Sequence, residues 1–534
     1  MFTNPRWLED AVFYEIYPQS FYDTNGDGIG DLPGVIQKLD YIKSLGVNAI
    51  WLNPCFESPF QDAGYDVSDF RKVAARYGSN DDLKELFDRA HAMGMKVILD
   101  LVAGHTSVEH PWFQESMQAE KNKYSNYYIW TDNWTEGDDK YKFINGYSPR
   151  NGNFMINFFY CQPALNYGFR DPDPEKPWQL PCDHPDVIAV REEMRDIMRF
   201  WLDMGADGFR VDMASSLVRG DNKAQGIKEI WEDYRSWMDE NYPEAVLVSE
   251  WSHPADAVNV GFHIDFMVHF NLPGYSSLLR CEKYRVPNSP FPAGNSFFDR
   301  EGKGDAKLFA DELLGQLEAI KGRGYVSVPT GNHDIGRIRQ GRDLDELKVI
   351  YAFLLTLPGV PFIYYGDEIG MDYIEGLQSK EGGYNRTGAR TPMQWDNSAN
   401  AGFSSAAASE LYLPVDASPD RTTVAAQEQP EDSLLNTVRK MIAIRRTNPA
   451  LASDGDFEVL FAETGKYPFV YARSLAGKKF VIAVNPSGNI VSEDISCSGS
   501  ALTEVLCSGC AVEAVGDVFR LNMQAVSYGI YSIE

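Results

Sequence analysis

A repeated alternation of short apolar runs with helix-patterned stretches constrains the fold of this chain more than any other feature. Each run is rich in β-branched or aromatic residues and is too short for a helix, which is typical of buried parallel strands. Between the second and third runs, 81–94 has an apolar helical face made of Leu83, Leu86, Phe87 and Ala90. Eight such βα units predict a (β/α)8 TIM barrel of the α/β class, with its active site at the carboxyl ends of the strands. The eight predicted strands are 11–18, 48–54, 96–102, 208–214, 245–251, 266–271, 326–334 and 359–368.

Two departures from the alternation predict further domains. After the third strand, residues 104–180 are rich in Asn, Tyr, Asp and Pro and have no βα pattern, which indicates an inserted domain. After a last helix at 433–451, the apolar period changes to two, which predicts a C-terminal antiparallel β domain. The predicted organisation is 1–103 and 181–452 for the barrel, 104–180 for the insertion and 453–534 for the β domain.

Charge and composition narrow the class of ligand. The 534 residues carry a formal net charge of −28, which disfavours binding to nucleic acid and to anionic membranes. The amino terminus has no basic start followed by an apolar core, and no run of about 18 apolar residues occurs. We therefore expect a cytoplasmic protein with a small neutral or cationic substrate and no membrane partner.

The cysteines do not indicate a disulfide framework. The seven residues are odd in number and scattered along the chain. The CSGC pair at 507–510 has the spacing of a zinc or redox motif, but it lacks a second CxxC, so a functional role is the weaker alternative.

Three predicted strands end in acidic residues, Asp212, Glu250 and Asp334. Residues two apart in a strand share a face, so Arg210 should lie beside Asp212 and hold it ionised as a nucleophile. Glu250 stands next to the apolar Trp251, which suits a general acid. An acid and a base in different environments form the pattern of glycosidic bond cleavage. Acids at strand ends also cap helices, but three on different barrel strands make that alternative weaker for the whole set.

At these positions the chain resembles the α-amylase family of retaining glycoside hydrolases and transglycosylases. The segments DLVAGH (100–105), GFRVDMAS (208–215), SEW (249–251) and GNHD (331–334) are similar to its four characteristic regions, in the same order. The resemblance covers essentially the whole chain and implies no organic cofactor.

The resemblance also implies roles for individual residues. Retention of configuration implies a separation of about 5 to 5.5 Å between the carboxyl groups of Asp212 and Glu250. The implied roles are Asp212 as nucleophile, Glu250 as general acid/base, Asp334 as transition-state stabiliser, His105 and His333 as ligands of the sugar hydroxyls, and Arg210 beside the nucleophile.

Two further motifs resemble those of the oligo-1,6-glucosidase-like branch. They are QPALN (162–166) and GARTPMQWD (388–396). By this likeness Asp62, Tyr65 and Arg390 bind the terminal sugar, and an Asp62–Arg390 ion pair closes the pocket beyond it. A closed pocket favours removal of single glucose units.

Three positions depart from the family pattern. Gly104 replaces the usual Asn before the region-one histidine, which argues against the calcium site that α-amylases build there. Ala164 replaces Asp in the QPDLN signature, and Met213 replaces the Val or Ala that follows the nucleophile in the branch. The linkage preference therefore cannot be read from Met213.

The segment DTNGDGIGDL after the first strand resembles both an EF-hand loop and a calcium-binding stretch of the oligo-1,6-glucosidase-like enzymes. The bidentate Glu that an EF-hand needs at position twelve is Gly34 here, and such residues are also common in solvated turns. We expect a structural Ca²⁺ that stabilises a βα loop. Its predicted ligands are Asp23, Asn25, Asp27, the Ile29 carbonyl and Asp31.

The sequence favours an exo-acting α-glucosidase acting on short oligosaccharides, and two alternatives remain. Residues 64–79, 357–371 and 410–416 also resemble trehalose synthases, which would make the chain a glucosyl isomerase or transglycosylase. A non-catalytic barrel, similar to the heavy chains of amino-acid transporters, is disfavoured because all three acids are present and no membrane helix is.

Overall fold

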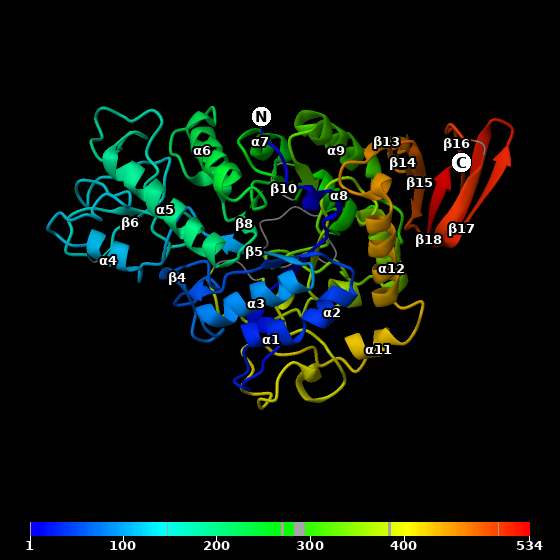
Figure 1. Ribbon diagram of the computed structural model, residues 1–534, viewed down its shortest axis with the longest axis horizontal. Helices are drawn as coiled ribbons and strands as arrows, with labels where there is room; N and C mark the ends of the chain where they lie inside the picture. The colour runs from blue at the N-terminus through cyan, green and yellow to red at the C-terminus, as the bar shows by residue number, and fades with distance from the viewer. Residues whose placement is uncertain are drawn as a thin grey trace.

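A nearly closed parallel barrel forms the centre of the molecule. The structure is a computed structural model that describes residues 2–146, 148–268, 272–281, 294–382, 386–499 and 501–533. The sheet order is β11-β10-β9-β8-β5-β2-β1-β12, and the bonds from the Val360 N–H to the Val326 carbonyl and from the Thr330 N–H to the Phe362 carbonyl link its two ends. The predicted TIM barrel is confirmed (Figure 1). Its strands are β1 (Phe13–Ile16), β2 (Ala49–Leu52), β5 (Lys96–Leu101), β8 (Gly208–Val211), β9 (Val246–Ser249), β10 (Ile264–Phe266), β11 (Tyr325–Ser327) and β12 (Phe362–Tyr364).

One barrel strand lies earlier than predicted. The strand expected at 266–271 is β10, which ends at Phe266, and 269–271 are outside the described residues. The apolar run continues to Val268, so apolar character alone could not show where the ladder ends.

Helices surround the barrel and begin and end at recognisable signals. In α3 the Ser79 and Asp82 side chains form a capping box, and the predicted apolar face is buried. The helix α5 ends at Met204, and the next residue, Gly205, has a φ of 124° that ends the helical conformation. Trp201 of α5 stacks on Phe56 with ring centroids 4.9 Å apart. The helices are α1 (Leu32–Gln37), α2 (Leu39–Ser44), α3 (Asn80–Ala92), α4 (Pro111–Ser116), α5 (Pro185–Met204), α6 (Gln225–Asn241), α7 (Pro254–Asn259), α8 (Gly274–Leu279), α9 (Ala306–Ile320), α10 (Leu344–Leu354), α11 (Val424–Glu428) and α12 (Leu434–Thr447).

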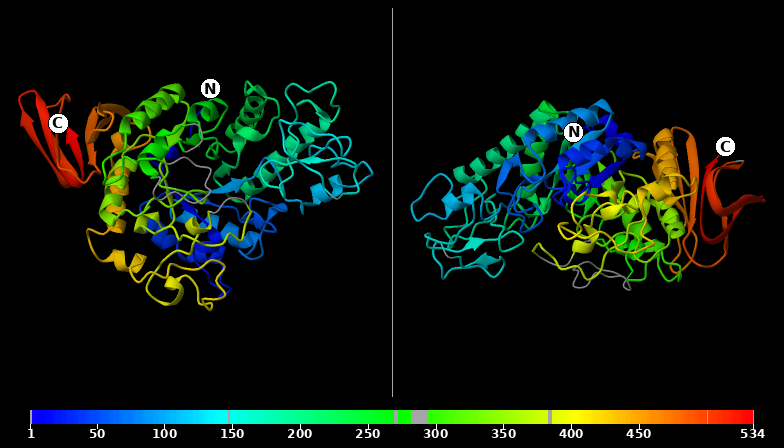
Figure 2. Two further views of the ribbon diagram at one scale, coloured as in Figure 1. Left: turned by 180° about the vertical axis from the view of Figure 1, so that it is seen from behind. Right: turned by 90° about the horizontal axis from the view of Figure 1, so that it is seen from below.

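The insertion after the third barrel strand forms a small unit of its own. It holds α4 and the pair β6 (Phe143–Ile144) and β7 (Phe154–Met155), with a separate apolar cluster around Phe169 and Trp178. A second hairpin, β3 (Phe56–Glu57) and β4 (Asp69–Val73), follows β2 and was not predicted. In Figures 1 and 2 the insertion lies at the opposite end of the molecule from the C-terminal sheet.

The C-terminal region is an antiparallel sheet, as predicted, but its strands are longer. The apolar period of two predicts separate strands at 518–523 and 525–533, but these residues form one strand, β18, which pairs with β17 on either side of a bulge. The CSGC pair lies inside β17, and all seven cysteines are free. The predicted helix 433–451 ends at Thr447, because Pro449 follows and the chain continues as a 3₁₀ turn. The strands are β13 (Asp456–Phe461), β14 (Phe469–Leu475), β15 (Lys478–Asn485), β16 (Val491–Ile495), β17 (Leu502–Val515) and β18 (Val518–Ile533).

Candidate active site

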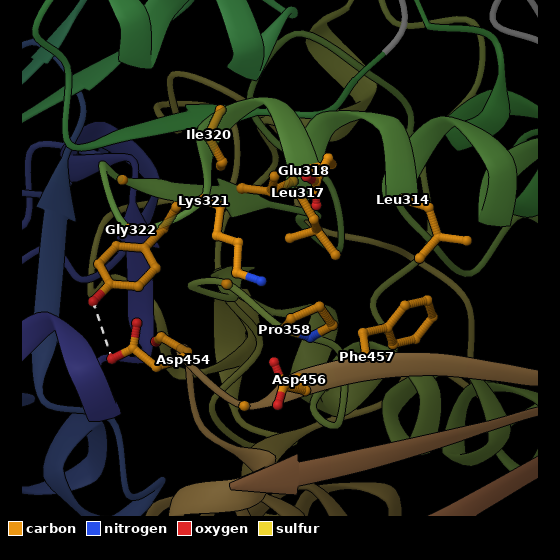
Figure 3. Close-up of a pocket in the computed structure, with 16 residues that line it drawn as sticks. Leu314, Leu317, Glu318, Ile320, Lys321, Gly322, Pro358, Asp454, Asp456 and Phe457 are labelled. Carbon is orange, nitrogen blue, oxygen red and sulfur yellow. Dashed lines mark hydrogen bonds between the residues drawn. The ribbon is translucent and has the colours of Figure 1, made fainter.

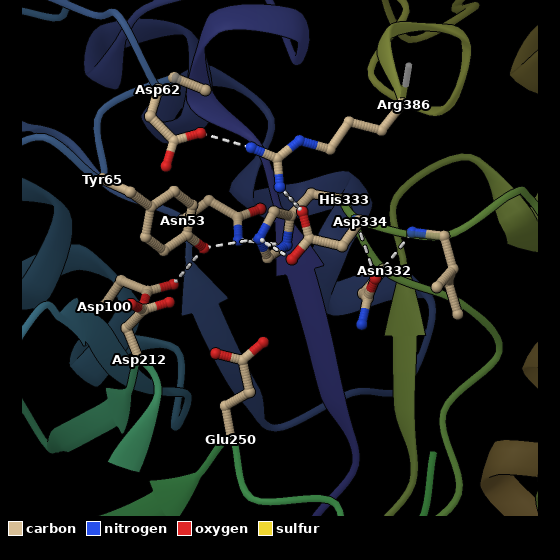
Figure 4. A network of polar contacts seen from close by, with 12 residues as sticks. Asn53, Asp62, Tyr65, Asp100, Asp212, Glu250, Asn332, His333, Asp334 and Arg386 are labelled. Carbon is tan, nitrogen blue, oxygen red and sulfur yellow. Dashed lines mark hydrogen bonds and ion pairs between the residues drawn. The ribbon is translucent and has the colours of Figure 1, made fainter. Parts of the chain in front are cut away.

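The three predicted catalytic acids meet at the carboxyl ends of the barrel strands (Figure 4). Asp212 directly follows β8 and Glu250 directly follows β9. Their backbone N–H groups donate to the carbonyls of Leu101 and Val211, at 3.0 Å each, so the ladder fixes where both side chains begin. Asp334 comes from the loop after β11. The fold therefore brings together acids that are far apart in sequence.

Arg210 joins the acids on neighbouring strands. This buried guanidinium lies 2.9 Å from Asp100 and 3.1 Å from Asp212 through Nη1, and 3.0 Å from Glu250 through Nη2. Glu250 also accepts a 3.0 Å bond from the N–H of Met213, whose φ of 44° is in the left-handed region. A shared guanidinium keeps the carboxyl groups of Asp212 and Glu250 near one another, and their separation stays a prediction.

The charge state expected for Asp212 is not the one that this environment favours. Burial and the neighbouring Glu250 carboxylate raise the pKa of Asp212 well above its usual value, and Arg210 only partly opposes them. Arg210 divides its charge among three acids, which is why it opposes this rise only in part, and ionised Asp212 stays a prediction. In the substrate-free site the nearby Glu250 carboxylate therefore disfavours ionisation of Asp212.

His333 and Asp334 form an oppositely charged pair next to these acids. His333 Nε2 lies 3.3 Å from Asp334 Oδ2 and 2.7 Å from the Tyr65 hydroxyl, and Nδ1 lies 2.9 Å from Glu15 Oε1. Burial disfavours the imidazolium, but the carboxylates of Asp334 and Glu15 outweigh it and raise the pKa of His333 to about 9. Burial likewise opposes ionisation of Asp334, yet His333 and two arginines hold its pKa well below the usual range. Asp334 is thus an anion at neutral pH.

The arginine that pairs with Asp62 is Arg386, so the predicted Asp62–Arg390 ion pair is wrong. Arg386 forms ion pairs with both Asp62 and Asp334. Arg390 lies 3.0 Å from Asp334 and 2.5 Å from Glu381, and it donates from Nε to the His333 carbonyl at 2.8 Å. Both arginines stand in the segment NRTGAR, and sequence alone gave no way to tell which one reaches across to Asp62.

The QPALN segment has a clear part in this arrangement. Gln162 donates to Asp62 Oδ2 at 2.7 Å, opposite the oxygen that meets Arg386. Burial raises the pKa of Asp62 to about 7, against the opposing effect of Arg386. Ala164 is fully buried and pairs with His105 in a β-bridge, so the departure from Asp falls at a backbone contact.

His105 is buried with both ring nitrogens next to protein atoms. Nε2 lies 3.1 Å from the Tyr65 carbonyl, and Nδ1 lies 3.1 Å from the Asn157 side chain. Burial lowers the pKa of His105 to about 4, so the ring is neutral at physiological pH. Its predicted bond to a sugar hydroxyl stays a prediction. A Cβ at Gly104 would meet Asn157 Nδ2 at 2.6 Å, so a larger residue before this histidine would require the Asn157 side chain to move.

Asp265 is one of the residues that the sequence did not point to. It is fully buried in β10, and its Oδ1 accepts bonds from the Trp251 N–H at 3.0 Å and the Ser249 hydroxyl at 2.6 Å. Oδ2 accepts from the His253 N–H at 2.8 Å. Asp265 thus anchors the chain on both sides of Glu250. Its only sequence signal was an acid amid apolar residues in HIDFMV, a pattern that equally fits a strand end.

The predicted calcium loop satisfies its own oxygens in this structure. Asp23 accepts the N–H groups of Asn25, Gly26 and Gly28 and the hydroxyl of Ser404. Asp31 caps α1 through Oδ1 and accepts from the main-chain N–H and hydroxyl of Thr24 through Oδ2. Across the described ranges no three His, Cys, Asp or Glu residues are grouped to hold a metal ion. Bound Ca²⁺ would need the Asn25 amide and the Ile29 carbonyl as well as Asp27, and calcium binding stays a prediction.

A cavity lies away from these acids, at the other end of the barrel strands. It has a volume of about 220 Å³ and is lined by residues of α9, the start of β11 and the segment 453–457 (Figure 3). Tyr325, the first residue of β11, donates to Asp454 at 3.3 Å there. The cavity is therefore at the amino-terminal end of the strands and is separate from the catalytic constellation.

Among the described residues, no helix combines the length and the apolar character needed to span a membrane.

Comparisons with known proteins agree with the geometry. The family model described as "Alpha amylase, catalytic domain" matches residues 15–454. The chain is 36% identical over 513 residues to the trehalose synthase/amylase TreS of Mycobacterium tuberculosis, covering 89% of this chain and 80% of that protein. It is 32% identical over 531 residues to the oligo-1,6-glucosidase of Parageobacillus thermoglucosidasius, covering 90% of each.

Solved structures give the same picture. A structure of MutB in complex with isomaltulose superposes with a TM-score of 0.80 at 26% identity and covers 99% of both chains. The α-glucosyl transfer enzyme XgtA superposes with a TM-score of 0.77 at 28% identity and covers 100% of both chains.

Proposed function

The chain belongs to the α-amylase family, in the branch of trehalose synthases and oligo-1,6-glucosidases, and from that premise we propose that it is a retaining, exo-acting α-glucosidase. The proposed substrates are short oligosaccharides with a terminal α-linked glucose. The proposal rests above all on one observation: Arg210 contacts Asp212 and Glu250 together at the barrel mouth. Two carboxyl groups kept close together by a shared cation can flank one glycosidic bond, as a double displacement requires.

In the proposed reaction Glu250 protonates the glycosidic oxygen while Asp212 attacks the anomeric carbon. The bond to the leaving sugar breaks as the bond to the Asp212 oxygen forms, and the leaving sugar takes the proton. A water molecule, deprotonated by Glu250, then releases glucose with its configuration retained. The chemistry requires Asp212 as the anion and Glu250 with the proton, and a neutral Glu250 would remove the neighbouring negative charge that raises the pKa of Asp212.

Asp334 and its cations complete the proposed site. Asp334 is held ionised, so it would stabilise the positive charge that develops on the sugar ring. The Asp62–Arg386 ion pair lies beyond it and would bind the hydroxyls of the terminal glucose through two charged groups. A site closed at that end would accept a chain terminus and cleave one glucose at a time.

A second function keeps the same first half-reaction. The 36% identity to a trehalose synthase favours a glucosyl isomerase, in which a sugar hydroxyl rather than water attacks the glucosyl-Asp212 intermediate. The likeness to the trehalulose synthase MutB fits the same alternative, since one MutB structure was solved with isomaltulose.

Product analysis on maltose separates these functions. Purified enzyme is incubated with maltose, and glucose, trehalose and isomaltose are quantified by chromatography over time. Glucose as the dominant product supports the hydrolase, and a rearranged disaccharide as the dominant product supports the isomerase. Absence of both, with sucrose, isomaltose and maltotriose also unconverted, would contradict the proposed activity. The Asp212→Asn variant is the negative control.

A further inference from the structure

An acidic residue stands in the middle of the first barrel strand, where an apolar side chain is expected. Glu15 of β1 is 0% exposed, and its strand neighbours Tyr14 and Ile16 are also fully buried. A buried carboxylate is unfavourable unless a cation or hydrogen-bond donors compensate it. The compensation for Glu15 is therefore informative about its role.

The partner of Glu15 is a histidine that is 318 residues away in sequence. Glu15 Oε1 lies 2.9 Å from Nδ1 of His333, and Asn53 Nδ2 lies 3.1 Å from the same nitrogen. Glu15 Oε2 and Asn53 Oδ1 are buried without a hydrogen-bond partner among the described residues. Burial raises the pKa of Glu15, and the contact with His333 opposes that rise more than the hydrogen bond from the Asn53 side chain does, so the imidazole ring is the main partner that compensates the carboxylate.

The opposite edge of the ring also faces an acid. His333 Nε2 lies 3.3 Å from Asp334 Oδ2 and 2.7 Å from the Tyr65 hydroxyl, which itself donates to Asp100 at 3.0 Å. A neutral imidazole can donate from only one nitrogen, whereas an imidazolium donates from both. Carboxylates at both nitrogens therefore select the charged form of the ring.

Other charged groups around the ring do not reverse this preference. The rings of Tyr65 and Tyr17 lie nearly parallel to the imidazole ring, and Trp51 lies nearly perpendicular to it. Arg390 contacts the histidine through the main-chain carbonyl and is itself paired with Asp334 and Glu381. Arg210, on the far side of Tyr65, is paired with Asp100 and the two catalytic acids. Arg386 and Arg390 thus share Asp334 with His333, but each is also matched by a second carboxylate, Asp62 or Glu381.

We propose that Glu15 is a positioning residue that keeps His333 doubly protonated, with its Nε2–H directed at the Tyr65 hydroxyl and Asp334. The expected effect of Glu15 on turnover rests on the proposed function. The protonation of His333 does not, because it can be measured without any substrate. The imidazolium adds a positive charge that favours ionised Asp334 and keeps a donor available at Nε2. At Glu15 a neutral amide would preserve the shape of this contact and remove its charge.

The test compares Glu15→Gln with a matched control. In the control, Glu368→Gln, the original glutamate is equally buried but bonds to the hydroxyls of Tyr14 and Tyr41, outside the site. Histidine ¹⁵N shifts are recorded across pH in the substrate-free proteins, with His333→Asn assigning the signal. Wild type and control should keep both nitrogens protonated at pH 8, and Glu15→Gln should not. A neutral His333 in wild type at pH 7, or an unchanged titration in Glu15→Gln, would overturn the proposal.

The pH profile of turnover gives the second readout. The alkaline limb of kcat/KM should move to lower pH in Glu15→Gln, with a loss of more than about tenfold at pH 8 and a smaller one at pH 6. A uniform loss at every pH would indicate a structural role only and would contradict the proposal. If Glu15→Gln does not fold, Glu15→Asp keeps the charge at a longer distance and should show a smaller shift of the same sign. An unmoved limb in Glu15→Asp would then overturn it.

Discussion

Arg386 forms an ion pair with Asp62 across the mouth of the barrel, and the same guanidinium also pairs with Asp334. Asp62 lies in the segment after β2, and Arg386 is 324 residues further along the chain. Both side chains are almost completely buried. The closed end of the proposed glucose pocket thus depends on Arg386. Arg390 instead pairs with Asp334 and donates to the main-chain carbonyl of His333.

Arg386→Ala should weaken substrate binding more than any exposed arginine substitution does. Loss of the guanidinium leaves Asp62 buried without its ion-pair partner and should raise KM for maltose by about 10- to 100-fold. A double-mutant cycle with Asp62→Asn should give a coupling energy of about 1 to 3 kcal/mol, measured from kcat/KM. Arg199→Ala, at a surface pair with Asp196, is the control and should leave KM unchanged. Additive effects of the Arg386 and Asp62 substitutions would contradict the direct pairing.

Asp334 should make the protein sensitive to acid. Its folded pKa is depressed, so its contribution to stability is present above the unfolded value of about 3.9 and is lost as pH falls through the folded value. Asp334→Asn lacks this group, so its Tm should lie below that of wild type at pH 6 and the gap should narrow towards pH 3. Differential scanning calorimetry with Asp88→Asn as an exposed control measures this. A gap that stays constant or widens with acid would argue against the depressed pKa.

Asp265→Asn should slow the chemical step without much change in binding. The amide offers one acceptor oxygen in place of two, so the N–H group of either Trp251 or His253 loses its partner and the chain around Glu250 loosens. Misplacement of a general acid should lower kcat by about 10- to 100-fold with KM nearly unchanged. Steady-state kinetics on an aryl α-glucoside provide the measurement, and Asp88→Asn serves again as control. A rise in KM with unchanged kcat would point to a different role.

Chelation should lower stability more than it lowers activity. If the loop at 23–31 binds Ca²⁺, the ion stabilises the folded state only, so its removal should lower Tm and its return should restore it. The melting temperature is measured in metal-free buffer with a chelator, with added Ca²⁺ and with added Mg²⁺. Asp27→Ala should melt at the same temperature in all three. A wild-type Tm that does not respond to Ca²⁺ would remove the calcium proposal and leave the proposed chemistry intact.

The barrel and the three acids could be predicted because their signals are local. Buried strands leave continuous apolar runs, and the carboxyl ends of parallel strands meet at one face, so Asp212, Glu250 and Asp334 were placed together from topology alone. Arg210 was placed correctly because residues two apart share a strand face. The raised pKa of Asp212 could not be predicted in this way, since it depends on burial and on Glu250 and Asp100 from neighbouring strands.

The remaining features depend on contacts between distant segments. The choice between Arg386 and Arg390 is made by how one loop folds over Asp62, and both arginines fit the sequence equally well. Glu15 was hidden in a run that otherwise indicates a buried strand, and only His333 explains its presence. The extent of β18 was missed because a bulge interrupts the period of two on which the prediction depended.

The central claim is that Asp212 becomes covalently glucosylated, and trapping that intermediate tests it most directly. The Glu250→Gln variant is incubated with 5-fluoro-α-glucosyl fluoride. Fluoride leaves without help from an acid, and the variant lacks the base that would activate water to hydrolyse the intermediate. Peptide mass spectrometry is then used to locate the added group. The account predicts one fluoroglucosyl group on the peptide that contains Asp212. It predicts no label in the double variant that carries both Glu250→Gln and Asp212→Asn. A label on another residue, or fluoride release at the wild-type rate with no label on Asp212, would contradict it.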